Sequence, residues 1–150
     1  MPRYKLTIEY DGTPFAGWQR QKTHPSVQQA IEEAIGRMSG ESVTLQAAGR
    51  TDAGVHALGQ VVHINLLKEW DPLRIREALN YHLRPDPIGV IAVEAVDDSF
   101  EARFSATARH YEYRILNRRA PPILERNHVW HVATPLDADI MGRAAGLILG

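Results

Sequence analysis

The first forty residues carry two hydrophobic patterns, one with the period of a strand and one with the period of a helix. In residues 3–10, apolar or aromatic side chains occupy every second position, which predicts a half-buried strand. After a loop, Ser26 and Gln29 have the spacing of a capping box, and apolar positions then repeat at helical spacing up to Gly40. The pattern therefore predicts a strand followed by an amphipathic helix.

The following segment predicts three more strands and a second helix. Residues 43–48 and 60–66 are rich in apolar residues and flank a glycine-containing loop, so each predicts a strand. Asp71-Pro72 is an N-cap with proline at the first helical position, and residues 88–96 form another apolar strand pattern. The order β-α-β-β-α-β predicts an α+β fold of the ferredoxin-like type, with an antiparallel sheet and helices on one face.

Two further strands are predicted in the last third of the chain. Residues 106–116 form one strand pattern, with Tyr111 and Tyr113 on the same face, and residues 128–132 form a shorter one. Because tyrosines two positions apart share a face of a strand, burial of both is the default expectation.

A final helix is predicted from about Asp137, and its apolar residues continue almost to the last position. No strand follows that this helix could cover. The chain reads as a fragment of a longer protein, with an open sheet edge that favours self-association.

Composition narrows the functional classes. The 150 residues include no cysteine, which excludes disulfide scaffolds, thiol nucleophiles and thiolate metal sites and favours an intracellular compartment. No segment resembles a signal peptide or a membrane helix, so we expect a cytoplasmic protein.

Charge adds one indication. The net charge is −1, yet 14 of the 17 basic residues are arginines, and residues 103–126 hold six of these arginines against two glutamates. Arginine suits planar, bidentate recognition of phosphate or carboxylate, so a local basic surface is expected.

The least generic segment is Gly49–His56, in which two glycines bound a loop that carries Arg50 and Asp52. One interpretation is an Asx turn, in which the Asp52 carboxylate bonds nearby backbone amides and Arg50 is merely exposed. The other is a nucleophilic or general-base Asp52 that is held ionised by the positive charge of Arg50. The residues of the loop alone leave both interpretations open.

Other kinds of site fit this loop less well. An aspartic protease needs a hydroxyl residue after its aspartate and a second copy of the motif, and the chain has neither. A metal site could be drawn from Asp52, His56 and His63, but seven histidines in 150 residues give chance pairings. The glycines match neither a dinucleotide fingerprint nor a phosphate-binding P-loop.

Two segments combine aromatic and basic residues in a way that suits RNA. Residues 104–114 interleave aromatic residues with arginines, as a surface that stacks bases and binds phosphates requires. Near the N-terminus, residues 15–21 form either a packed loop anchored by Trp18 or an RNA-contacting loop that uses Arg20. The sequence does not choose between these two.

Five motifs follow one another in order over nearly the whole chain: Glu9–Gly12, Gly17–Gln21, Gly49–His56, Gly59–His63 and Arg103–Tyr113. The most specific is Gly49–His56, which reads Gly-Arg-Thr-Asp-Ala-Gly-Val-His. Together these motifs resemble those of the tRNA pseudouridine synthase A family.

The resemblance implies an isomerase that converts uridine to pseudouridine in the anticodon stem-loop of tRNA, at positions 38, 39 and 40, with no cofactor and no metal. It makes Asp52 the catalytic nucleophile, attacking C6 of the base or C1′ of the ribose. It makes Arg50 a substrate-binding residue that helps to extrude the target nucleotide, and Tyr111 the residue that stacks on the flipped base. Unstacking costs a few kcal/mol, which phosphate contacts could offset. The candidates for such contacts are Arg20, Arg103, Arg109 and Arg114.

The resemblance also concerns partners and completeness. It implies a homodimer with tRNA lying across both subunits. It also implies a ferredoxin-like catalytic domain over residues 1–105, followed over residues 106–150 by the first strands and helix of an incomplete second domain. The family's second half is related to the first by a pseudo-twofold axis, and nothing in these residues matches it. We therefore expect weak or no turnover from the 150 residues in isolation. A non-catalytic RNA-binding module of the ferredoxin-like type remains the alternative.

Overall fold

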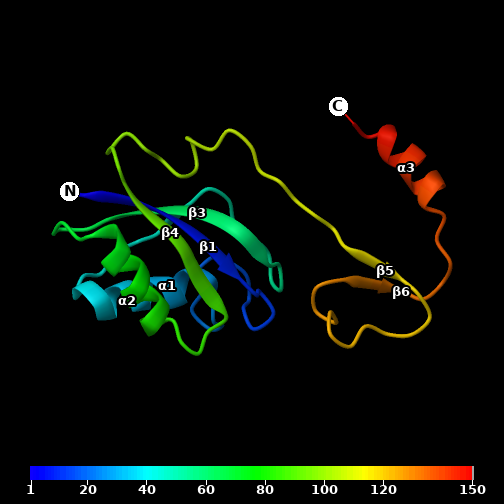
Figure 1. The fold of residues 1–150 in the computed structure, drawn as a ribbon, viewed down its shortest axis with the longest axis horizontal. Coiled ribbons are helices and arrows are strands. Elements are labelled where there is room, and N and C mark those ends of the chain that lie inside the picture. The colour runs from blue at the N-terminus through cyan, green and yellow to red at the C-terminus, as the bar shows by residue number, and fades with distance from the viewer. Residues whose placement is uncertain (150) are drawn as a thin grey trace. The chain divides into compact units, whose positions relative to one another are not determined.

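The computed structural model describes residues 1–149 (Figure 1). The chain forms two compact units, Met1–Arg109 and His110–Gly150, whereas the sequence led us to expect a division after residue 105. No helix in the described part of the chain is both long enough and apolar enough to cross a lipid bilayer.

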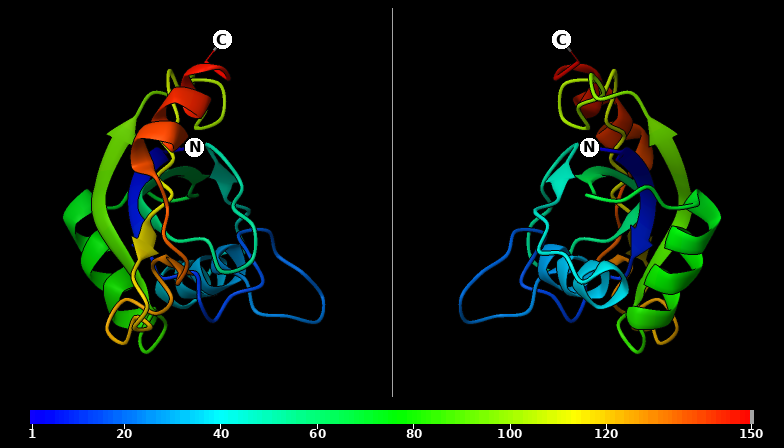
Figure 2. Two further views of the ribbon diagram at one scale, coloured as in Figure 1. Left: turned by 90° about the vertical axis from the view of Figure 1, so that its right-hand side faces the viewer. Right: turned by 90° about the vertical axis from the view of Figure 1, so that its left-hand side faces the viewer.

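The first unit is a four-stranded antiparallel sheet with two helices on one side of it (Figure 1). The strand order is β2-β3-β1-β4, so the first strand lies in the interior of the sheet. Figure 2 shows this strand in dark blue between β3 and β4. Its elements in chain order are β1 (Arg3–Tyr10), α1 (Val27–Ser39), β2 (Gln46–Ala47), β3 (Ala57–Asn65), α2 (Pro72–His82) and β4 (Ile88–Val96).

The alternation of β1 builds the hydrophobic core. Its even-numbered residues are buried and its odd-numbered residues are at least partly exposed, as the period of a strand requires. Leu6 lies opposite Val62 of β3 and Val93 of β4, so apolar side chains from three strands meet on one face. The helices cover this face with Ile31, Ile35, Ile75 and Leu79, which are fully buried.

Helix α1 begins and ends as the sequence predicts, although only half of the capping box forms. The Ser26 side chain accepts a hydrogen bond from the backbone N–H of Gln29, which satisfies one of the unpaired donors of the first turn. The Gln29 side chain does not return to Ser26 but donates to Glu33 at 2.9 Å. The helix ends at Gly40, whose φ of 76° is a left-handed conformation that glycine adopts without strain.

Helix α2 is fixed to β1 just before its first residue. Asp71 caps it by accepting from the backbone N–H of Leu73 at 3.1 Å, and Pro72 takes the first helical position. The hydroxyl of Tyr4 accepts from the N–H of Trp70 at 2.8 Å and donates to its carbonyl at 3.0 Å. This buried tyrosine therefore fixes the entry to α2.

The strand predicted over residues 43–48 is wrong in extent, because β2 comprises only Gln46 and Ala47. The backbone N–H of Leu45 donates to the Glu32 carboxylate of α1 at 3.1 Å and therefore does not bond a neighbouring strand. The segment before β2 is thus bound to a helix side chain, which hydrophobicity alone did not predict. By contrast, β3 is longer than predicted and begins at Ala57.

The second unit contains two short parallel strands, β5 (Ile115–Asn117) and β6 (Trp130–Val132), and helix α3 (Ala138–Gly146). The helix begins where the sequence predicts, capped by Asp137. The strand predicted over residues 106–116 is mostly absent, because only the last residues of that range and Asn117 pair with β6. A strand needs partners along its length for its backbone groups, but before Ile115 only the carbonyl of Arg114 bonds β6, where it accepts from the N–H of Trp130 at 2.7 Å.

The predicted burial of the two tyrosines is also wrong. Tyr111 is 71% exposed and Tyr113 is 91% exposed. Both precede β5 and lie outside any regular strand, so no sheet covers either ring.

The sheet face opposite the helices carries one buried histidine, His63 of β3, which is 3% exposed. Its Nδ1 accepts from the backbone N–H of Ala102 at 3.1 Å, and the Phe100 ring lies edge-on to it. An Nδ1 that accepts a hydrogen bond carries no proton, so the ring is neutral in this arrangement. Burial lowers the pKa of His63, and Arg3 adds to this effect while the Glu101 carboxylate opposes it.

We expect His63 to make the fold less stable in weak acid. Because its folded-state pKa is lowered, the unfolded chain binds more protons, so its contribution is complete above about pH 6.5 and is lost as pH falls below that value. Urea unfolding between pH 5 and 8 should show a smaller loss of stability on acidification for His63→Gln than for the natural chain. The control His24→Gln replaces an exposed histidine and should follow the natural chain. Equal acid sensitivity of His63→Gln and the natural chain would rule out this assignment.

Candidate active site

The segment Gly49–His56 is a loop that joins β2 to β3, and the two strands hold its first residues. The N–H of Ala48 donates to the carbonyl of Val61 at 2.8 Å. The Gln60 side chain donates to the carbonyl of Gly49 at 2.7 Å. The loop therefore leaves the sheet in a fixed direction.

The segment that follows β1 lies against this loop and binds its backbone. The N–H of Trp18 donates to the carbonyl of Thr51 at 2.9 Å, and the N–H of Gly54 donates to the carbonyl of Phe15 at 3.4 Å. Two segments far apart in sequence thus pair through their main chains, which orders a loop that has no regular secondary structure.

Two glycines allow this close approach. A Cβ atom on Gly12 would overlap the carbonyl of Val55, and one on Gly17 would lie 2.8 Å from the carbonyl oxygen of Thr51. Gly17 also has a φ of 102°, a backbone conformation that residues with a Cβ atom rarely adopt. These positions require glycine because the two backbones are in contact.

The inner side of the loop contacts the end of β1. The hydroxyl groups of Tyr10 and Thr51 share a hydrogen bond of 2.8 Å. The Tyr10 ring packs against Trp18 with ring centroids 6.0 Å apart, and both rings are nearly fully buried. The loop is therefore attached to the hydrophobic core through Thr51.

Arg50 and Asp52 are exposed on this ordered backbone. Within the described chain, neither side chain takes part in a hydrogen bond or ion pair, so Arg50 is not paired with Asp52 in this structure. The Asx turn does not form either: the turn is closed by the main-chain carbonyl of Asp52, which accepts from the N–H of Val55 at 3.2 Å. A carboxylate and a guanidinium on a fixed loop are thus available to a ligand.

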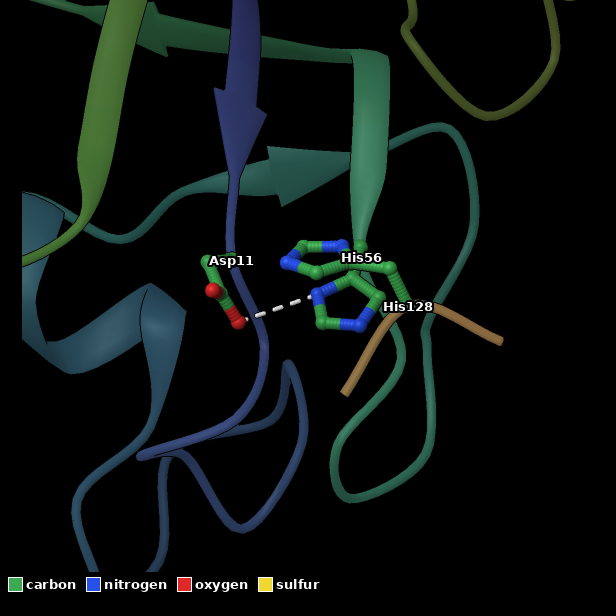
Figure 3. Close-up of side chains that lie close together, drawn as sticks. All are labelled: Asp11, His56 and His128. Atoms are coloured by element: carbon green, nitrogen blue, oxygen red, sulfur yellow. Dashed lines mark ion pairs between the residues drawn. The ribbon is translucent and has the colours of Figure 1, made fainter. Parts of the chain in front are cut away.

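The last residue of the loop, His56, meets the residues that follow β1 (Figure 3). Its Nδ1 lies 3.0 Å from the backbone N of Gly12 and 3.0 Å from the Asp11 carboxylate. Because one ring nitrogen cannot accept and donate at the same time, Nδ1 makes only one of these two hydrogen bonds at a time. The third residue drawn, His128, belongs to the second unit.

The metal site considered from Asp52, His56 and His63 does not assemble among the described residues. His63 is enclosed on the sheet face by its bond to Ala102, whereas Asp52 is exposed in the loop.

The Arg109 side chain makes intramolecular hydrogen bonds near the start of the same loop. Its guanidinium donates twice to the carbonyl of Ala48, at 3.0 and 2.7 Å, and once to the carbonyl of Arg103 at 3.0 Å. Arg103 lies over the Phe104 ring, 5.7 Å from its centroid. The sequence suggested Arg109 and Arg103 as RNA contacts but did not show that Arg109 ties the 103–109 segment to the loop.

The remaining candidate residues are more scattered. Arg20 pairs with Glu32 of α1 at 2.9 Å. In the second unit, Arg114 pairs with Glu125 at 2.6 Å, and Tyr111 is exposed. In the first unit, Arg109 therefore bonds Ala48, which precedes the loop that carries Arg50 and Asp52.

The sequence did not predict that Tyr10, Gly12, Gly17 and Thr51 hold this loop through their mutual contacts. The local signals were the motifs Glu9–Gly12, Gly17–Gln21 and Gly49–His56, which contain these residues. Their partners lie about forty residues away, and a single sequence gives no measure of such distances.

The fold and site define an α+β domain that presents an arginine and an aspartate on a backbone held from two sides. Residues 6–105 match the family model described as tRNA pseudouridine synthase. The chain belongs to this family, which confirms the resemblance of its motifs.

Curated relatives support the same family assignment. The whole chain is 61% identical to tRNA pseudouridine synthase A of Methylobacterium radiotolerans and covers 59% of that protein. It is 60% identical to the protein of the same name from Methylorubrum populi and 55% identical to that from Maricaulis maris, and covers 60% of each. The chain thus spans about 60% of the length of these relatives.

We expect Gly12→Ala to destabilise the first unit by roughly 1–3 kcal/mol, because the added methyl group forces apart two backbones in contact. Gly59→Ala is the matched control, since its Cβ would meet only the Thr7 methyl group at 4.0 Å. Urea unfolding measures both, and the control should change by less than about 1 kcal/mol. Equal stability of the two variants would contradict the close approach.

Proposed function

We propose that the chain carries the nucleophile-bearing part of an enzyme that isomerises uridine to pseudouridine in the anticodon stem-loop of tRNA. The observation that carries this proposal is the exposed Asp52 on a loop whose backbone is bound on both sides. Family membership supports the reaction class, and the names of the relatives support tRNA as the substrate.

The reaction rearranges one nucleotide without adding or removing atoms overall. The bond from N1 to C1′ breaks, the base turns, and a bond forms from C5 to C1′; C5 then loses its proton and N1 gains one. Asp52 acts as the nucleophile, on either C6 or C1′, and leaves as a carboxylate. The base must leave the helical stack before either atom can be reached.

Arg50 and Tyr111 bind the extruded nucleotide in this proposal. Arg50 is two residues from the nucleophile and exposed, so its guanidinium can bind a phosphate bidentately. Tyr111 stacks on the flipped base, and its ring is 71% exposed in the unit that follows. Stacking on an aromatic ring is a common means of holding an unpaired base.

Phosphate contacts draw on Arg20, Arg103, Arg109 and Arg114. A guanidinium has five N–H donors, and the intramolecular bonds of Arg20 and Arg109 use only some of them. Their ion pairs and carbonyl contacts also orient these groups before RNA binds.

The proposal includes the organisation of the protein. The order β2-β3-β1-β4 supports a ferredoxin-like first domain, with the nucleophile loop in residues 1–105 and a second domain beginning within residues 106–150. We further propose a cytoplasmic homodimer without cofactor or metal. Because the relatives are longer, we expect the chain by itself to have weak or no turnover.

A second candidate is a non-catalytic RNA-binding module. The observation in its favour is the exposure of Tyr111 and Tyr113 beside arginines in residues 103–114. The two functions differ in their dependence on Asp52, since a binding module needs no carboxylate there.

Asp52→Asn should abolish tritium release from tRNA that contains [5-³H]uridine, because the amide is not a nucleophile, while tRNA affinity changes less than about threefold. The assay is run on the chain and on a chimera in which the uncovered part of the Methylobacterium radiotolerans relative follows it. Glu77→Gln is the matched control: it also removes one exposed negative charge, from α2. Normal release by Asp52→Asn would reject the nucleophile, and loss of release with intact binding would reject the pure binding module.

Binding of the stem-loop should weaken with salt, with a slope of about −0.7 to −0.9 in log K against log salt for each phosphate neutralised. Arg50→Gln should reduce the magnitude of this slope by about one. Arg74→Gln, at an exposed position on α2, should leave it unchanged. A slope near zero for the natural chain would argue against phosphate contacts altogether.

A further inference from the structure

Thr51, the residue before Asp52, is held at both its main chain and its side chain. Its carbonyl accepts from the N–H of Trp18 at 2.9 Å, and its hydroxyl bonds the hydroxyl of Tyr10 at 2.8 Å. Tyr10 is 4% exposed and Trp18 is 2% exposed, so both partners of Thr51 belong to the hydrophobic core.

This attachment fixes the backbone of Asp52. The peptide group between Thr51 and Asp52 is planar, so a fixed Thr51 carbonyl fixes the plane that leads into Asp52. On the other side, the Asp52 carbonyl accepts from Val55, and Gly17 lies against residues 51–53. The carboxylate is left with the rotations of its own side chain.

A second buried tyrosine on the same strand shows what is particular to Tyr10. Tyr4 and Tyr10 both point to the core face of β1, but the Tyr4 hydroxyl bonds the main chain of Trp70 before α2. The Tyr10 hydroxyl bonds a side chain of the candidate catalytic loop. The Tyr4 hydroxyl thus fixes the start of a helix, whereas the Tyr10 hydroxyl fixes Thr51, the residue before Asp52.

We propose that Tyr10 is a positioning residue, which acts through Thr51 to hold the Asp52 carboxylate in the geometry that attacks the nucleotide. The proposal rests on the proposed role of Asp52 as the nucleophile. Tyr10 itself touches no reacting atom. Its contribution is geometric, and misplacement of a reacting group by about 1 Å can lower a rate by two orders of magnitude.

The first test measures loop order in the 150-residue chain and needs no turnover. Backbone ¹⁵N order parameters of residues 51–53 should fall in Tyr10→Phe from about 0.85, the value of a rigid backbone, toward 0.6. Thr51→Val should reproduce the effect, Thr51→Ser should keep the natural values, and Tyr4→Phe should leave the loop unchanged. Unchanged order in Tyr10→Phe overturns the proposal. If that variant fails to fold, Thr51→Val makes the same decision.

The second test separates positioning from a merely structural role. In the chimera, Tyr10→Phe should lower kcat about tenfold or more with KM for tRNA changed less than twofold, and Thr51→Ser should retain kcat. Tyr4→Phe should lower the unfolding temperature and spare kcat. Unchanged kcat in Tyr10→Phe overturns the proposal.

Asp52→Asn distinguishes failure of this inference from failure of the proposed function. If Asp52→Asn is inactive and Tyr10→Phe keeps both kcat and loop order, only the positioning role is rejected. If Asp52→Asn remains active, the nucleophile is rejected, and with it the catalytic part of the Tyr10 proposal. If the chimera is inactive in its natural sequence, the order parameters decide.

Discussion

The structure depends on β1 and on its pairing along both edges. The strand is bonded to β3 on one side and to β4 on the other, and its buried face holds the two helices through a shared core. The same strand ends at Tyr10, whose hydroxyl bonds that of Thr51. The segment that follows it contains Gly12 and Gly17, which contact the loop. Sheet, helix packing and candidate active site therefore share one element.

Prediction from the sequence succeeded where the deciding interactions are local. The ranges of β1 and β4 agree with the predicted strands, because a strict alternation and an apolar run leave little ambiguity. The helix starts were also predicted, since serine or aspartate caps act within one turn. These features need only neighbouring residues.

Prediction failed where a distant partner decides the conformation. The segment before β2 bonds Glu32 and leaves the ladder at Leu45. Residues 106–113 have a strand pattern but lie in no strand of the described structure. Hydrophobic periodicity shows which side chains could be buried. It does not show which backbone groups find partners.

The same distinction holds for the candidate active site. The glycine-bounded loop and its two charged residues could be found from the sequence, because loop boundaries and residue types are local properties. The contacts of Tyr10, Gly12 and Gly17 with residues 51–55 could not, because about forty residues separate them. The arginines suggested as RNA contacts showed a similar limit, since their residue type did not reveal that Arg109 binds the carbonyl of Ala48.

In the loop Gly49–His56, the residues that hold the backbone differ from the residues that are exposed to a ligand, and this has a consequence for protein engineering. The shape of the loop is determined by the buried Tyr10, by the close-packed Gly12 and Gly17, and by main-chain hydrogen bonds. The side chains of Arg50 and Asp52, by contrast, are exposed and make no hydrogen bond in the described structure. Exposed side chains without partners usually change stability by less than about 0.5 kcal/mol when replaced. The loop is thus a frame into which other reactive groups can be placed by single substitutions, with the backbone left to hold each new group in the same position.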